Sequence, residues 1–156
     1  MIVLDASAAV EWLLRTPKGL RIEAKIFSHA NTLHAPHLLD VEIAHALRRY
    51  VRGHEVTEAR AQELLQALLE VRILRHRHTT LLPRIWELRH HLTAFDAVYV
   101  ALAEALDAPL LTCDAKIAAA PGHRALVEVV RSQGTVSTRR ASKAARRGIS
   151  AITTDS

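Results

Sequence analysis

A chain of 156 residues, 49% of them hydrophobic, falls within the size of one domain and can supply one hydrophobic core. The formal net charge of +5 is uneven, because residues 1–130 hold 15 basic and 15 acidic side chains and residues 131–156 hold 6 and 1. No apolar run approaches the roughly 20 residues of a membrane span, and a single cysteine excludes an internal disulfide. We therefore expect a soluble cytoplasmic protein, with one domain at 1–130 and a basic, flexible tail at 131–156.

The predicted elements alternate between short apolar strands and amphipathic helices. In chain order we expect a strand at 2–4, helices at 6–14 and 20–28, a strand at 33–35, helices at 38–51 and 58–70, a strand at 71–74, helices at 81–90 and 97–106, and strands at 109–112 and 126–130. Strands separated by helices are typical of a parallel sheet with right-handed crossovers. The sequence therefore predicts the α/β class, as a three-layer α/β/α sandwich around a central, mostly parallel sheet.

Four acidic residues fall where such a sheet would gather ligands. Asp5 ends the first strand, and Asp114 follows the strand at 109–112. Asp96 stands at the start of the helix that leads into this second strand, and Glu42 lies one turn into the helix at 38–51. In open α/β sheets the ligand site lies beyond the carboxyl ends of the strands, especially where the strand order reverses. If the two strands are neighbours there, all four side chains can point into one cleft.

Carboxylates that crowd together resist ionisation unless a cation neutralises them. Mg²⁺ and Mn²⁺ prefer oxygen ligands, and a bound ion lowers the pKa of its water and stabilises charge on a phosphate during in-line attack. The acids therefore favour a metal-dependent nuclease, with Asp5, Asp96 and Asp114 as the principal ligands and Glu42 beside them.

Each acid also has a purely structural interpretation. Asp5 and Asp114 would suit the N-caps of helices that follow them. The stretch from Thr93 to Asp96 resembles a capping box, and the helix dipole favours Glu42 in a first turn. Only the joint placement of the acids at predicted strand ends favours chemistry over capping.

Three stretches carry a family resemblance. They are Met1-Ile-Val-Leu-Asp-Ala-Ser-Ala8, the helix Leu39-Asp-Val-Glu-Ile-Ala-His-Ala-Leu-Arg-Arg49, and Leu92-Thr-Ala-Phe-Asp-Ala-Val-Tyr-Val-Ala-Leu-Ala103 running on to Leu110-Leu-Thr-Cys-Asp-Ala-Lys116. In this order and spacing they resemble the PIN-domain ribonucleases and, among them, the VapC toxins of bacterial type II toxin–antitoxin pairs. The likeness covers about residues 1–130 and does not extend into the basic tail.

The resemblance implies an endoribonuclease toxin that depends on Mg²⁺ or Mn²⁺ and hydrolyses RNA with a metal-activated water. Its catalytic quartet maps onto Asp5, Glu42, Asp96 and Asp114. Asp5 and Asp96 are the expected metal ligands, Asp114 would serve a second metal or its water, and Glu42 would act through water. The resemblance also implies a homodimer and a small antitoxin protein that lays a helix across the site.

Four further residues are secondary candidates. Ser7 resembles the small hydroxyl residue at the mouth of the family's site, and a capping serine fits equally well. Arg48 and Arg49 would hold RNA phosphates or form a solvated helix end. Lys116 would balance the acidic cluster or contact phosphate, although exposed lysines are common. The ten histidines lack the spacing of zinc ligands, so we interpret them as solvated.

Two other functions stay open at this point. One is a solitary RNA-processing PIN nuclease that has no antitoxin, and a neighbouring reading frame for a small DNA-binding protein would argue against it. The other is a catalytically silent domain that binds RNA or protein, which the four intact acids disfavour.

Overall fold

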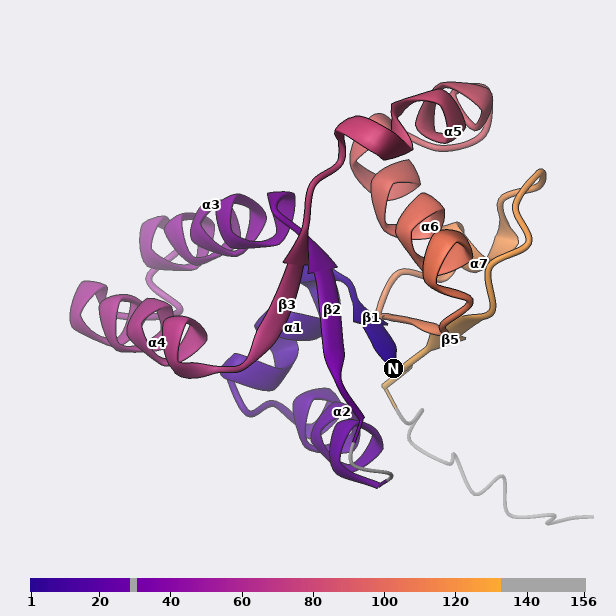
Figure 1. The fold of residues 1–156 in the computed structure, drawn as a ribbon. Coiled ribbons are helices and arrows are strands. Elements are labelled where there is room, and N and C mark those ends of the chain that lie inside the picture. Colours follow the sequence, from indigo (N-terminus) through magenta and orange to yellow (C-terminus); the bar gives the residue numbers. More distant parts are fainter. Residues whose placement is uncertain (29–30, 133–156) are drawn as a thin grey trace, which may run out of the picture.

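The computed structural model describes residues 1–28 and 31–132, and they form one parallel sheet with helices on both faces (Figure 1). The strands are β1 Ile2–Leu4, β2 Leu33–Pro36, β3 Ile73–His76, β4 Leu110–Thr112 and β5 Val127–Val129. Their order is β3-β2-β1-β4-β5, and every neighbouring pair is parallel. The predicted three-layer α/β/α fold is therefore confirmed.

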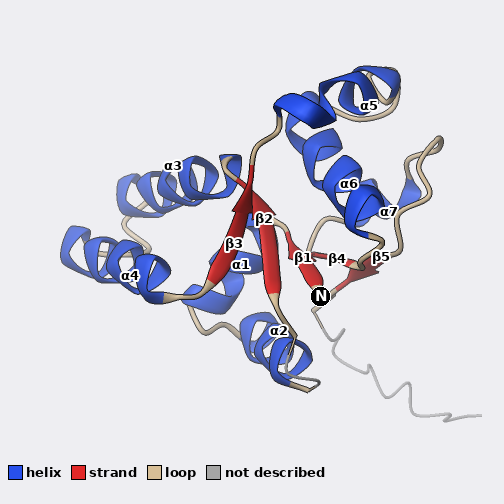
Figure 2. Cartoon of the chain, in the orientation of Figure 1, coloured by secondary structure: helices blue, strands red, loops and turns tan. Residues whose placement is uncertain are grey.

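The helices form two layers, as right-handed crossovers require (Figure 2). Helices α1 Ala6–Leu13, α2 Pro17–Phe27, α3 Leu38–Arg52 and α4 Glu58–Glu70 follow strands that step toward β3, and they cover one face. Helices α6 Ala94–Leu106 and α7 Ala115–Ala119 belong to steps in the opposite direction and cover the other face. The short 3-10 helix η1 Thr79–Leu81 and α5 Leu82–Glu87 lie beyond the carboxyl end of β3.

The core lies along the centre of the sheet. All three residues of β1 and all three of β4 are buried, because these strands are covered on both faces. Seven consecutive residues of α6, 97–103, are also buried, so this helix is apolar around most of its circumference. The residues that end the central strands are consequently held by a rigid framework.

Several element boundaries differ from the prediction by two or three residues. Thr16 ends the first helix but also caps the second, since its hydroxyl accepts the Gly19 amide at 3.0 Å and α2 therefore starts at Pro17. Thr93 does the same for α6, which begins at Ala94 rather than at 97. The strand expected at 71–74 lies at 73–76, and the helix expected at 81–90 is only the six residues of α5. Residues 115–119 form α7, which periodicity did not predict because it is so short.

Two other predictions concern the ends of the chain and the membrane. Residues 133–156, which hold most of the basic tail, lie outside the described residues, so the flexible tail stays a prediction. Within the described ranges, none of the helices combines the length and the hydropathy that crossing a bilayer demands.

One pair of histidines departs from the expectation of solvated side chains. His34 on β2 is only 6% exposed, and its Nδ1 lies 2.9 Å from Nε2 of His76 on β3. Its Nε2 lies 3.0 Å from the hydroxyl of Thr32, and the two imidazole rings are stacked. Burial, followed by the charge of His76 and of the N-terminal amino group, lowers the pKa of His34. The folded protein therefore favours neutral His34.

This lowered pKa makes stability depend on pH in a defined direction. The unfolded chain takes up a proton at His34 near pH 6.5, whereas the folded chain resists it. Neutral His34 therefore leaves the free energy of unfolding at its full value above pH 6.5. Below pH 6.5 the free energy of unfolding falls, by at most about 1.4 kcal/mol per pH unit. We expect His34→Gln to flatten the fall in free energy of unfolding between pH 7 and 5, measured by urea titration. His90→Gln, at an exposed position, should keep the wild-type slope.

Candidate metal centre at the carboxyl end of the sheet

Asp5 is the most constrained acid of the candidate site. It directly follows β1, is 6% exposed and caps α1 by accepting the Ser7 amide at 3.3 Å. The hydroxyls of Ser7 and Thr112 both donate to the same carboxylate oxygen, Oδ2, the second at 2.8 Å. Burial raises the pKa of Asp5, and these hydrogen bonds oppose the rise by stabilising the charged form. Hydrogen bonds thus orient the Asp5 carboxylate, and among the described residues none of the effects on its pKa comes from a positively charged group.

The hydroxyls join the ends of β1 and β4. Ser7 Oγ lies 3.2 Å from Thr112 Oγ1 and accepts the amide of Cys113 at 2.9 Å. Thr112 Oγ1 in turn accepts the amide of Asp114 at 3.0 Å. Because β1 and β4 are the neighbours at which the strand order reverses, this network lies where a ligand site is expected.

Glu42 is brought to the site by α3 and held by α6. Tyr99, which is 1% exposed, donates its phenolic hydroxyl to Glu42 Oε2 at 2.5 Å. Burial raises the pKa of Glu42, the bond from Tyr99 lowers it, and the negative charges of Asp5 and Asp96 raise it further. These two electrostatic effects indicate that Asp5 and Asp96 both lie near Glu42.

Asp96 and Asp114 are positioned by caps, as their structural interpretation predicted. Thr93 accepts the Asp96 amide at 3.1 Å and donates to its carboxylate at 2.7 Å, at the first turn of α6. Asp114 caps α7 and accepts the Lys116 amide at 2.8 Å. Capping and chemistry are therefore compatible, since each cap sets the direction of a carboxylate at the edge of the site.

A cleft of about 710 Å³ is lined by Ser7, Glu42 and Asp114, whereas Asp5 and Asp96, which were expected to share it, are not among its lining residues. Arg49 also lines it, because seven residues, or about two helical turns, return to the face of α3 that carries Glu42. Arg48 points elsewhere on the helix and is exposed, as is Lys116 on α7, and neither borders the cleft. Of the secondary candidates, Ser7 and Arg49 therefore line the cleft, and Arg48 and Lys116 do not.

The donor set suits a hard divalent cation. The side chains that meet here offer carboxylate and hydroxyl oxygens, the ligand type that Mg²⁺ and Mn²⁺ prefer. Burial is the main cause of the raised pKa of Asp5 and of Glu42, so both charged carboxylates are costly, and a nearby cation would offset that cost. Across residues 1–28 and 31–132, no three His, Cys, Asp or Glu side chains are yet close enough to hold a metal together. A metal ion at this site would therefore require side chains to move or waters to bridge to it.

Most of the chain is similar to known proteins. The protein-family model described as PIN domain matches residues 2–122 of the chain. This chain belongs to the PIN-domain family. Ribonuclease VapC1 from Mycobacterium tuberculosis is 42% identical over 130 residues, which cover 83% of this chain and 97% of that protein. Ribonuclease VapC12 from the same organism is 38% identical, with 83% and 99% covered. The resemblance seen in the three sequence stretches is confirmed, and these VapC proteins are relatives of the chain.

Solved structures agree on the fold. VapBC2 from Rickettsia felis, bound to a DNA fragment from its promoter, superposes with a TM-score of 0.62 at 17% identity, covering 83% of this chain and 98% of that one. VapC20 from Mycobacterium tuberculosis, described as a sarcin-ricin loop cleaving toxin, gives a TM-score of 0.59 at 15% identity, with 80% and 97% covered. At such identities the likeness establishes the PIN architecture alone.

Sequence analysis missed Tyr99 and gave Thr112 only a structural role. A signal for Tyr99 was available, because it lies three residues after Asp96 and hence on the same side of α6. Thr112 could not be assigned without knowing that β4 pairs with β1, which places its hydroxyl against Asp5. Lys18 and His45 also line the cleft of this PIN domain and were not singled out.

The Tyr99 hydroxyl should control the ionisation of Glu42. Tyr99→Phe keeps the buried ring and removes the donor that favours charged Glu42. We expect the pKa of Glu42 to rise further above its ordinary value, measured by NMR titration of the side-chain carboxylate. Tyr50→Phe, on the wall of the same cleft, is the matched control and should leave that titration unchanged. An identical Glu42 titration in all three proteins would show that the bond has no electrostatic effect.

Proposed function

We propose that this chain is a divalent-metal-dependent endoribonuclease that acts as the toxin of a cytoplasmic toxin–antitoxin pair. The observation that carries the proposal is the buried Asp5 carboxylate, which two hydroxyls orient. Its negative charge and that of Asp96 both raise the pKa of Glu42. Close relatives named as VapC ribonucleases, at 42% and 38% identity over most of the chain, support the same activity.

In this proposal Asp5, Asp96 and Asp114 would hold Mg²⁺ or Mn²⁺, and Oδ1 of Asp5 receives neither of the two hydroxyl hydrogen bonds. The bound ion would acidify water and stabilise charge on the phosphate that is attacked. Ser7 and Thr112 keep the Asp5 carboxylate in one orientation, so less reorganisation is required when the ion enters.

Other residues of the chain have separate tasks. Glu42, whose pKa is raised by burial and by neighbouring acids, is suited to accept a proton from the attacking water. Arg49 and His45 on α3 line the cleft, as does Lys18 on α2, which is ion-paired with Glu11. These side chains would hold the RNA backbone, because phosphate contacts position a strand without selecting its sequence. In-line attack of water would leave a 5′ phosphate and a 3′ hydroxyl.

The central test is loss of cleavage when single carboxylates become amides. We expect Asp5→Asn and Asp96→Asn to lower the rate of RNA cleavage with Mg²⁺ or Mn²⁺ by at least roughly a hundredfold, the usual effect of removing a key electrostatic group. Titration with Mn²⁺ should show weakened binding in the same variants. Asp107→Asn, at the far end of α6, is the control and should retain activity. Full activity in the first two variants would refute the assignment.

The proposal includes a small antitoxin protein that lies in the cleft as a helix, and a homodimeric toxin. Val41, Ala46 and Tyr50 supply apolar surface next to Glu42, and Val41 is 66% exposed. Such a ledge suits the apolar face of an amphipathic helix, which would at the same time deny RNA access to the acids. The cleft is also large enough to admit side chains from such a helix.

A neutral polar change at Val41 should separate inhibition from catalysis. We expect Val41→Asn to weaken binding of the antitoxin encoded beside the toxin at least about tenfold, since it disrupts an apolar contact. Asn adds no charge near Glu42, so RNA cleavage by the free protein should persist. Leu69→Asn, at an exposed position on α4, provides the control. Affinity would be measured by calorimetry, and light scattering of the free protein would test the homodimer.

A further inference from the structure

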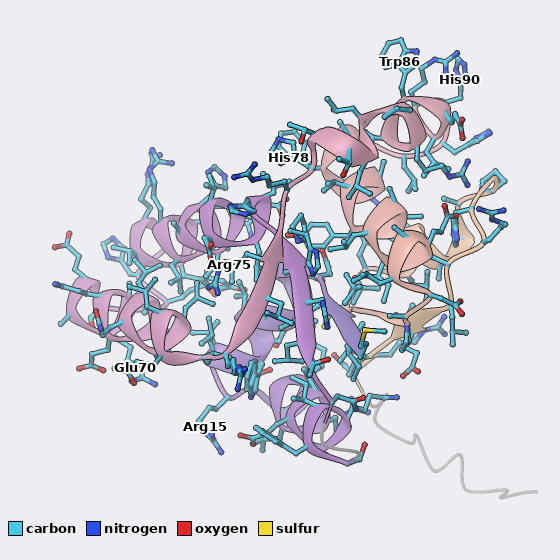
Figure 3. The ribbon with its side chains drawn as sticks, viewed as in Figure 1. Arg15, Glu70, Arg75, His78, Trp86 and His90 are labelled. Atoms are coloured by element: carbon cyan, nitrogen blue, oxygen red, sulfur yellow. The ribbon has the colours of Figure 1, made fainter. Side chains whose placement is uncertain are left out.

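A small apolar hollow lies between α3, α5 and α6, beside the candidate metal centre. Its volume is about 170 Å³, and its wall includes Leu38 from α3, His78 before η1, Leu82 and Ile85 from α5, and Phe95 and Val98 from α6. His78 lies where the chain leaves β3 and enters η1, at the rim of the sheet (Figure 3). Neither the acidic quartet nor the antitoxin ledge accounts for this hollow.

The hollow adjoins the cleft. Leu38 and Phe95 line both spaces, so these two side chains form the boundary that the hollow and the cleft share. Leu38 begins α3 one turn before Glu42, and Phe95 immediately precedes Asp96. A strand of RNA whose phosphate lies at the acids would therefore have an adjacent base within the neighbourhood of Phe95.

The chemistry of the hollow fits a flat apolar ring. Phe95 is 59% exposed and Leu82 is 53% exposed, so both leave apolar surface in water that a ligand would cover. The hollow is smaller than the roughly 300 Å³ at which pockets for drug-sized ligands begin, so it has room for one ring system but not for a helix. His78 supplies ring nitrogens that can hydrogen-bond to the edge of such a ligand.

We propose that this hollow receives one unpaired nucleobase of the RNA substrate, stacked on Phe95, next to the bond that is cut. Stacking on an aromatic ring accepts every base, because each base has a π face, and His78 adds a contact to the base edge. The base in the hollow would therefore belong to an unpaired nucleotide beside the cleavage position. This inference rests on the proposed ribonuclease function and extends it to substrate selection.

The experiment combines a binding readout with kinetics. Short single-stranded RNA carrying 2-aminopurine at successive positions is bound in EDTA, which prevents metal-dependent cleavage. We expect wild-type protein to quench the fluorescence at one position, and Phe95→Leu to abolish that quenching. With Mg²⁺ or Mn²⁺ added, Phe95→Leu should raise KM roughly tenfold, the effect of losing one stacked base, with much less change in kcat. Phe95→Tyr keeps the ring and should behave as wild type.

Phe27→Leu supplies the matched control, because Phe27 is the other phenylalanine of the chain and is likewise exposed, on α2. Equal quenching and equal KM in Phe95→Leu and wild type would overturn the inference. A loss of self-association in Phe95→Leu, with RNA binding unaffected, would assign the hollow to a second copy of the chain and would also overturn it. Absence of RNA cleavage by wild type would refute the proposed function, while the measurement in EDTA still decides whether a base is bound.

Discussion

The parallel pairing of β1 with β4 is the constraint on which the site depends. It sets Leu4 beside Leu111, so the next residues of each strand, Asp5 and Thr112, come into hydrogen-bond contact. The carboxylate is then buried at the point where strand order reverses, and in the described part of the chain hydroxyls and backbone amides stabilise its charge. A buried charge in this state is costly unless a cation joins it, which is a reason for a metal site here rather than elsewhere.

The capping interactions and the proposed chemistry use the same side chains. Asp5 and Asp114 satisfy free amides at the starts of α1 and α7, and Thr93 does so for α6. Because a cap fixes the side chain as well as the backbone, three helices that begin at the carboxyl edge hold their acids within a narrow range of directions. The structural interpretation of Asp5, Asp96 and Asp114 was therefore correct but incomplete, because the same caps also orient their carboxylates. It was wrong for Glu42, because the acid in the first turn of α3 is Asp40 and Glu42 lies farther along the helix.

Acidic, basic and apolar side chains lie close together in the cleft. Helix α3 lines the cleft both with Arg49, which suits phosphates, and with apolar side chains such as Val41, which suit a partner helix. Phe95 stands between the cleft and the smaller hollow. In the proposed function, RNA and antitoxin compete for one region because both need the space next to Glu42, and this mutual exclusion would be the basis of inhibition.

The sequence by itself determined the alternation of strands and helices, the parallel sheet and the four acids, because apolar runs, caps and the spacing of the three family stretches are local patterns. It predicted that all four acids could point into one cleft, whereas Glu42 and Asp114 line that cleft in the structure and Asp5 and Asp96 do not. It did not predict the role of Tyr99 or the separation of Arg49 from Arg48 at the cleft. It also treated His34 as solvated, although it is buried against His76. Tertiary structure decided these points, because strand order and helix rotation place residues more than fifty positions apart in contact, as for Tyr99 and Glu42 with a separation of 57.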